Sequence, residues 1–327
     1  MALEIVFVHL GSNPPLHLLM NLSRTQKLFQ DYKVTLLGNY ESSRLTDRFN
    51  FVKIDFDQAE FSVESKYSYP KDFRNNFWFS SLARFSMIDK YMRSNNNSVL
   101  HVESDVILAQ DFPMKSFEQI KESFAFPIVS QSRGIASTLF IKDSDSASTL
   151  WQFSSELVDE NSLYSDMEIL YELNSRNPEL VLKLPIAPIS LKSASINSQR
   201  TSNFGGYFDG HDFGVFLAGT NPWNERGVSR LHTKISESLL DFNSSNFIFD
   251  RSRDFISLKV DNQSALKLFS LHITNKNPIF FYHRTTGRAL ETWLKKLSSK
   301  SFTFHPFVWF IMLKRFILKK IRRATPS

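Results

Sequence analysis

Short apolar runs and segments of helical periodicity alternate through the first part of the chain. Residues 4–9, 33–37 and 51–56 are apolar runs bounded by turn-forming residues, which is typical of strands. Between the first two runs, residues 16–29 carry apolar side chains at helical spacing. Strand–helix–strand units that repeat at about 30 residues are typical of a parallel sheet covered by helices. The pattern therefore predicts an α/β protein with a mostly parallel sheet flanked by helices.

The most regular predicted helix spans residues 75–93, where apolar side chains recur at helical spacing from Trp78 to Met92. Residues 99–102 follow as a predicted buried strand, which runs directly into Glu103-Ser104-Asp105. Further strands are predicted at residues 106–108, 139–141, 180–184 and 268–273, further helices at 147–157 and 164–173, and a hairpin at 247–249 and 255–260.

One segment departs from this regular pattern. Residues 190–230 hold six of the ten glycines of the chain, together with many polar side chains. A long glycine-rich segment inside a compact domain is usually a functional loop. Because no proline- or glycine-rich linker divides the chain, we expect one domain over residues 1–300 and a tail over residues 301–327.

The composition excludes several classes of protein. The chain has no cysteine, which excludes a disulfide scaffold, a thiolate metal site and a cysteine nucleophile. It also lacks the glycine motifs of dinucleotide-binding and P-loop proteins. The net charge of +6 arises from six cations in the last fourteen residues; without them, the 39 basic residues fall to 33, equal to the 33 acidic ones. A nucleic-acid-binding face over the domain is therefore disfavoured.

The most informative polar residues are Glu103 and Asp105, two carboxylates one residue apart at the end of a predicted buried strand. In extended chain, residues i and i+2 point to the same side, so both can face one ligand. The carboxyl ends of parallel strands are where α/β folds bind ligands, and Mg²⁺ or Mn²⁺ prefers oxygen donors. An isolated acidic pair is most often a solvated turn, but the preceding helix and strand favour a binding site.

The segment FWFSSLARFSMIDKYMRSNNNSVLHVESDVIL resembles the donor site of GT-A-fold glycosyltransferases, in which a helix bearing an arginine precedes a strand and a D/E-x-D motif. Five further segments extend the resemblance over most of residues 4–277: FVHLGSNPP, GIASTLFIKDS, YSDMEIL, the glycine-rich segment FGGYFDGHDFGVFLAGTNPWNERG, and LFSLHITNKN. Glu103 stands where many relatives have aspartate. The resemblance implies a GT-A-like, Rossmann-type fold that binds a nucleotide-sugar diphosphate and a divalent metal.

Carried over to this chain, the resemblance implies roles for individual residues. Asp105 would be the principal ligand of Mn²⁺ or Mg²⁺, and Glu103 would support the metal or contact the ribose. His272 would be the third metal ligand, although a single histidine beside an apolar strand is also common in a core. Four residues are implied to contact the donor nucleotide or its diphosphate: Ser12, Asn13, Arg84 and Lys276.

The acceptor side is expected in the later segments. A transferase that inverts the sugar configuration needs a carboxylate to accept the proton of the attacking hydroxyl. Asp166, Asp209 and Asp212 are candidates for this role, and each is alternatively a helix cap or turn residue. The residues do not distinguish among the three.

The tail has its own pattern. Residues 302–323 combine aromatic and aliphatic side chains with interleaved lysine and arginine, as in basic amphipathic segments that lie on anionic membranes. An oligomer-packing helix or a disordered basic end are the alternatives. We expect no transmembrane helix and no export signal, and hence a peripheral protein on the cytoplasmic face of a membrane.

Together these features predict a metal-dependent glycosyltransferase. It would move a sugar from a nucleotide-sugar donor to a hydroxyl of a glycan or lipid-linked acceptor. The alternatives are an inactive, sugar-binding scaffold subunit and a nucleotidyltransferase. The second normally has a glycine-rich basic loop after its first strand, and the LGSNPP segment has no basic residue.

Overall fold

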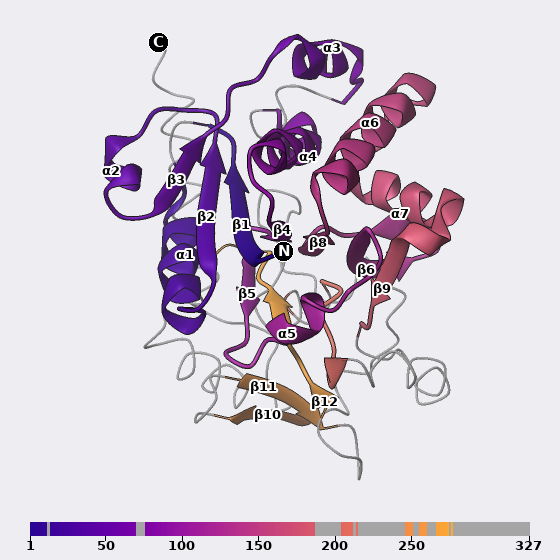
Figure 1. Ribbon diagram of the computed structural model, residues 1–327. Coiled ribbons are helices and arrows are strands. Elements are labelled where there is room, and N and C mark those ends of the chain that lie inside the picture. Colours follow the sequence, from indigo (N-terminus) through magenta and orange to yellow (C-terminus); the bar gives the residue numbers. More distant parts are fainter. Residues whose placement is uncertain are drawn as a thin grey trace, which may run out of the picture.

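The computed structural model describes residues 1–11, 14–69, 76–186, 204–211, 214, 246–250, 255–259, 266–274 and 276. Its central layer is an eight-stranded sheet with the strand order β3-β2-β1-β4-β8-β6-β7, to which β9 adds beside β6 (Figure 1). The strands are β1 (Leu3–His9), β2 (Lys33–Gly38), β3 (Asn50–Lys53), β4 (Ser98–Val102), β6 (Phe124–Ser130), β7 (Arg133–Gly134), β8 (Thr138–Ile141) and β9 (Val181–Leu184).

The sheet is mixed. Strands β3, β2, β1 and β4 are parallel, as the apolar runs predict, whereas β8 pairs antiparallel with both β4 and β6. The buried centre explains the apolar runs, since Ile5, Val6 and Phe7 of β1 have no exposed surface. The predicted α/β class is confirmed, and the antiparallel β8 and the unpredicted strands β6 and β7 are the differences within this sheet.

Helices cover both faces of the sheet. One face packs against α1 (Leu16–Leu28) and α5 (Met114–Phe117), and the other against α4 (Phe77–Arg93), α6 (Ser144–Glu160) and α7 (Asp166–Arg176) (Figure 1). Two short helices, α2 (Ser43–Thr46) and α3 (Gln58–Lys66), and the 3-10 turn η1 (Pro178–Leu180) complete the described helices. Among the described residues, no helix is both long enough and apolar enough to span a membrane.

Two smaller sheets carry the later part of the chain. β10 (Asn246–Asp250), β11 (Phe255–Lys259) and β12 (Leu266–Lys267) form an antiparallel sheet that contains the predicted hairpin. The predicted strand over residues 268–273 is instead β13 (Ser270–His272), which pairs antiparallel with β5 (Val106–Leu108). After β12 the chain leaves the small antiparallel sheet and continues as β13, which pairs with β5. This pairing places His272 opposite Val106, next to the acidic pair.

A cluster of phenylalanines holds the late segments to the sheet. Phe208 has no exposed surface, and its ring centroid lies 5.5–5.9 Å from those of four neighbours. These neighbours are Phe112, Phe117, Phe204 and Phe269. The cluster therefore joins residues 204–211 and 266–274 to the layer under the large sheet.

We expect Phe208→Ala to lower the free energy of unfolding by about 3–5 kcal/mol, because it leaves a cavity among four aromatic rings. The measurement is urea unfolding followed by circular dichroism. Phe61→Ala is the matched control, since that ring is 52% exposed and its loss should have an effect within about 0.5 kcal/mol. Equal effects of the two substitutions would contradict the proposed anchoring role of the cluster.

Candidate metal and donor site

The acidic pair lies where β4 ends, on a turn that the backbone fixes. The Glu103 N–H donates to the carbonyl of Ser137 at 3.2 Å, and the Val106 N–H donates back to the carbonyl of Glu103 at 3.0 Å. The Asp105 carbonyl accepts the N–H of Ile273 at 2.7 Å. The turn is therefore tied both to the residue before β8 and to the residue after β13.

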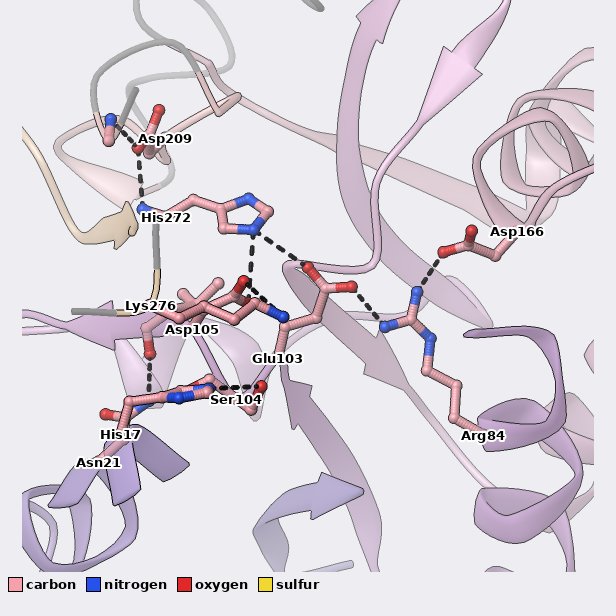
Figure 2. A network of polar contacts seen from close by, with 12 residues as sticks. His17, Asn21, Arg84, Glu103, Ser104, Asp105, Asp166, Asp209, His272 and Lys276 are labelled. Carbon is pink, nitrogen blue, oxygen red and sulfur yellow. Dashed lines mark hydrogen bonds and ion pairs between the residues drawn. The ribbon is translucent and has the colours of Figure 1, made fainter. Parts of the chain in front are cut away.

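His272 from β13 completes a group of three possible metal ligands (Figure 2). Its Nε2 lies 3.5 Å from Asp105 Oδ1 and 3.6 Å from Glu103 Oε2. One donor atom from each of the three residues lies within 4.8 Å of the others. The Nζ of Lys276 lies 3.3 Å from Asp105 Oδ2. Residues that are far apart in the sequence thus converge on the acidic pair, as the resemblance implies.

The charges of the group depend on one another. Burial alone would lower the pKa of His272, but the carboxylates of Asp105 and Glu103 raise it to about 9. Burial would conversely raise the pKa of Asp105, but Lys276 and His272 hold it well below its usual value. Burial also opposes ionisation of Glu103, and Arg84 and His272 outweigh it, so that the pKa of Glu103 is lowered. Two carboxylates therefore remain ionised in a buried position.

The donor set fits a divalent metal. Two carboxylates supply hard oxygen ligands and negative charge, and the imidazole of His272 supplies a borderline nitrogen once an arriving metal has displaced its proton. Glu103, Asp105 and His272 are thus the residues that would hold the ion.

Arg84 connects this group to α7. From α4, its Nη1 pairs with Glu103 Oε1 and its Nη2 pairs with Asp166 Oδ2, and only 8% of the residue is exposed (Figure 2). Burial raises the pKa of Asp166 against the opposing effect of Arg84. Ser165 and Glu168 form the capping box of α7, so the Asp166 carboxylate is available to the arginine. The predicted arginine therefore lies against the acidic pair.

Asp209 supports the opposite side of the group. It has no exposed surface, and its Oδ2 accepts the backbone N–H groups of His272 and Gly214, both at 2.9 Å. These bonds hold the backbone of a predicted metal ligand. The roles of Asp166 and Asp209 as acceptor bases stay predictions. Ser12, Asn13 and Asp212 lie outside the described residues.

Unusual backbone conformations flank His272. Within the described part of the chain, three non-glycine residues have positive φ, and two of them are His211, at 89°, and Lys276, at 55°. The rings of His211 and His272 meet edge to face at 5.2 Å. Burial lowers the pKa of His211 to about 3, so that it is neutral. Backbone strain of this kind is concentrated at functional sites.

Sequence reasoning missed a polar face of α1 that contacts the same turn. The Nε2 of His17 lies 3.4 Å from the Ser104 hydroxyl, and Asn21 donates to the carbonyls of Ser104 and Val106. Arg24 donates to the carbonyl of Leu108 at 2.5 Å. The sequence does contain a signal for this face. His17, Asn21 and Arg24 are spaced i, i+4 and i+7, so in a helix they share one side.

No family model and no curated protein matches the chain. Solved structures similar to it include the galactosyltransferase LgtC in complex with donor and acceptor sugar analogs, with 13% identity over 94% of this chain and 99% of that one and a TM-score of 0.45. Mouse xyloside xylosyltransferase 1 has 10% identity over 62% and 92% and a TM-score of 0.37. A glycosyltransferase involved in glycosylation of the major capsid of PBCV-1 has 10% identity over 61% and 90% and a TM-score of 0.32. At such scores the function is inferred from the side chains themselves.

We expect Arg84→Met to lower the free energy of unfolding by about 3–5 kcal/mol at neutral pH, because the carboxylates of Glu103 and Asp166 lose their shared cation. Adding Asp166→Asn to this variant should recover part of the loss. Denaturant unfolding of the single and double variants measures both effects.

The matched control is Arg176→Met on α7. The Arg176 side chain is 42% exposed and pairs with Glu160, which is 52% exposed, so its loss should cost less than about 1 kcal/mol. A cost at Arg84 that is no larger than at Arg176, or that the second substitution does not reduce, would refute the shared-cation interpretation.

Proposed function

We propose that this protein is a metal-dependent glycosyltransferase that moves a sugar from a nucleotide-sugar donor to a hydroxyl of a glycan or lipid-linked acceptor. The observation that carries the proposal is the convergence of Glu103, Asp105 and His272 with two cations, Arg84 and Lys276, at the end of β4. This combination suits a diphosphate leaving group, which carries negative charge and needs both a metal and fixed cations. A plain structural ion-pair network would not need three ligand-type side chains within 4.8 Å.

A bound divalent ion would neutralise charge on the diphosphate as its bond to the sugar breaks. The chain itself would contribute positive charge through Lys276, whose ammonium lies beside Asp105. Arg84 would keep Glu103 ionised and hold it in place. Ser12 and Asn13 are proposed to contact the nucleotide, and Asp166, Asp209 or Asp212 to accept the proton of the acceptor hydroxyl if the reaction inverts configuration.

We expect Asp105→Asn to reduce sugar transfer at least 100-fold with little change in stability, because it removes a ligand charge and little volume. His272→Ala should raise the Mn²⁺ concentration needed for half-maximal activity. The measurement is nucleotide release from a panel of nucleotide sugars with graded Mn²⁺ or excess EDTA, after a thermal-shift screen for the bound donor.

Asp159→Asn is the control for this series, since that side chain is 53% exposed and pairs only with Lys66 among the described residues. Full activity in EDTA, or an unchanged rate for Asp105→Asn, would exclude the metal-dependent reaction. Donor binding without any transfer would instead favour the inactive scaffold, and pyrophosphate release from nucleoside triphosphates would favour a nucleotidyltransferase.

The proposal extends to the location of the enzyme. We propose a catalytic domain over residues 1–300 and a tail over residues 301–327 that binds anionic lipid at the cytoplasmic face of the inner membrane. The tail lies outside the described residues, and its sequence is the support: six cations interleaved with aromatic and aliphatic side chains. Each cation near an anionic surface contributes about 1 kcal/mol, so the six together approach ~6 kcal/mol.

Truncation after residue 300 should abolish sedimentation with anionic liposomes and leave nucleotide binding intact. The full-length protein should pellet with anionic but not with neutral liposomes, and salt should partly reverse this binding, because charges are screened beyond about 8–10 Å. Equal pelleting of the truncated protein, or no preference for anionic lipid, would show that the tail has another role.

A further inference from the structure

The strand that follows Asp105 and the strand that carries His272 form a narrow ribbon with two outer edges. β5 and β13 pair with each other, and in the described part of the chain they make a sheet of only two strands. Just before β5, the carbonyl of Asp105 accepts the N–H of Ile273, the residue after β13. Carbonyls of alternate residues point to the same edge of a strand. Those of Val106 and Leu108 in β5 therefore face the other edge.

Side chains of α1 occupy that outer edge in place of a neighbouring strand. Asn21 Nδ2 donates to the carbonyl of Val106 at 2.7 Å and to that of Ser104 at 3.2 Å (Figure 2). One helical turn further along α1, Arg24 donates to the carbonyl of Leu108. Asn21 has no exposed surface, so water does not compete for these bonds. The helix thus substitutes for a strand along the full length of β5.

Asn21 binds the backbone on both sides of Asp105. Its two acceptors are the carbonyls immediately before and after Asp105, and it touches neither carboxylate of the pair in any described contact. The amide oxygen of Asn21 has no hydrogen-bond partner among the described residues, so the amide group makes its described bonds through Nδ2 alone. An amide turned the other way would place oxygen against oxygen, so the side chain has one acceptable orientation.

We propose that Asn21 is a positioning residue of the metal site: by fixing the backbone on both sides of Asp105, it holds that carboxylate toward His272. The proposal rests on the metal site of the proposed function. Residues that orient metal ligands commonly change metal affinity 10–100-fold when substituted. Most residues of that kind bind the side chain of a metal ligand, whereas Asn21 binds the backbone on either side of the ligand Asp105.

The test is Mn²⁺ affinity of the purified full-length protein, measured by isothermal titration calorimetry well below the unfolding temperature. Asn21→Leu keeps the approximate size of the side chain and removes the donor. Thr25→Val, also fully buried on α1, is the matched control, because the Thr25 hydroxyl has no hydrogen-bond partner among the described residues. We expect Asn21→Leu to weaken Mn²⁺ binding at least tenfold and Thr25→Val to change it less than twofold.

A second readout separates positioning from general destabilisation. Saturating Mn²⁺ should restore most of the turnover of Asn21→Leu, which a damaged fold would not recover. If Asn21→Leu does not fold, Asn21→Ser, which is smaller and overpacks nothing, is titrated with Mn²⁺ in its place and should show the same loss of affinity.

Three outcomes would overturn the proposal. The first is an Asn21 variant that binds Mn²⁺ as tightly as the wild-type protein, and the second is an equal loss of affinity in the Asn21 and Thr25 variants. Either result would refute the positioning role of Asn21 and leave the metal site standing. An absence of Mn²⁺ binding by the wild-type protein would refute the metal site itself, and with it this proposal.

Discussion

Ionised carboxylates are stable in a protein interior only where cations or hydrogen-bond donors lie beside them, and this constraint organises the site. Glu103, Asp105 and Asp166 are all largely buried, and the positive charges that accompany them come from separate elements. Arg84 approaches from α4, whereas His272 and Lys276 come with β13 and the residues that follow it. Removing either source leaves part of the negative charge uncompensated. The packing of α4, α7 and β13 around the end of β4 therefore also brings the cations next to the carboxylates that they neutralise.

The molecule divides the site between two layers that are joined by the pairing of β5 with β13 and by aromatic packing. The acids belong to the turn after a strand of the large sheet, but His272 belongs to the two-stranded ribbon beneath it. Phe208 and Phe269 bury the late segments, and backbone bonds of 2.7–2.8 Å link Tyr207 with Lys267 and Phe269. The many phenylalanines of the chain thus have a specific use, since they fix the relative position of two groups of site residues.

Much of the fold was predictable because buried parallel strands are continuous apolar runs. The strands near residues 4–9 and 33–37 and the helix that contains Arg84 were predicted within a few residues. β6 was missed, since its segment FAFPIVS contains a proline and no alternation, and pairing direction is not encoded in such a run. The acidic pair, Arg84 and His272 were predicted through motif order. The contribution of Asn21 was not, because a side chain that bonds to a distant backbone depends on how α1 packs against β5.

The order of residues along the chain also has a consequence for synthesis. Asp105 and His272 are separated by roughly 170 residues, whereas Arg84 and Glu103 belong to one short segment. At roughly 5–20 residues per second, the ribosome adds the histidine on the order of ten seconds or more after the acids. Glu103 can pair with Arg84 as soon as α4 and β4 have emerged, but Asp105 must wait for both His272 and Lys276. The nascent domain therefore carries an unpaired acidic residue at the end of its central strand until its last described segment arrives.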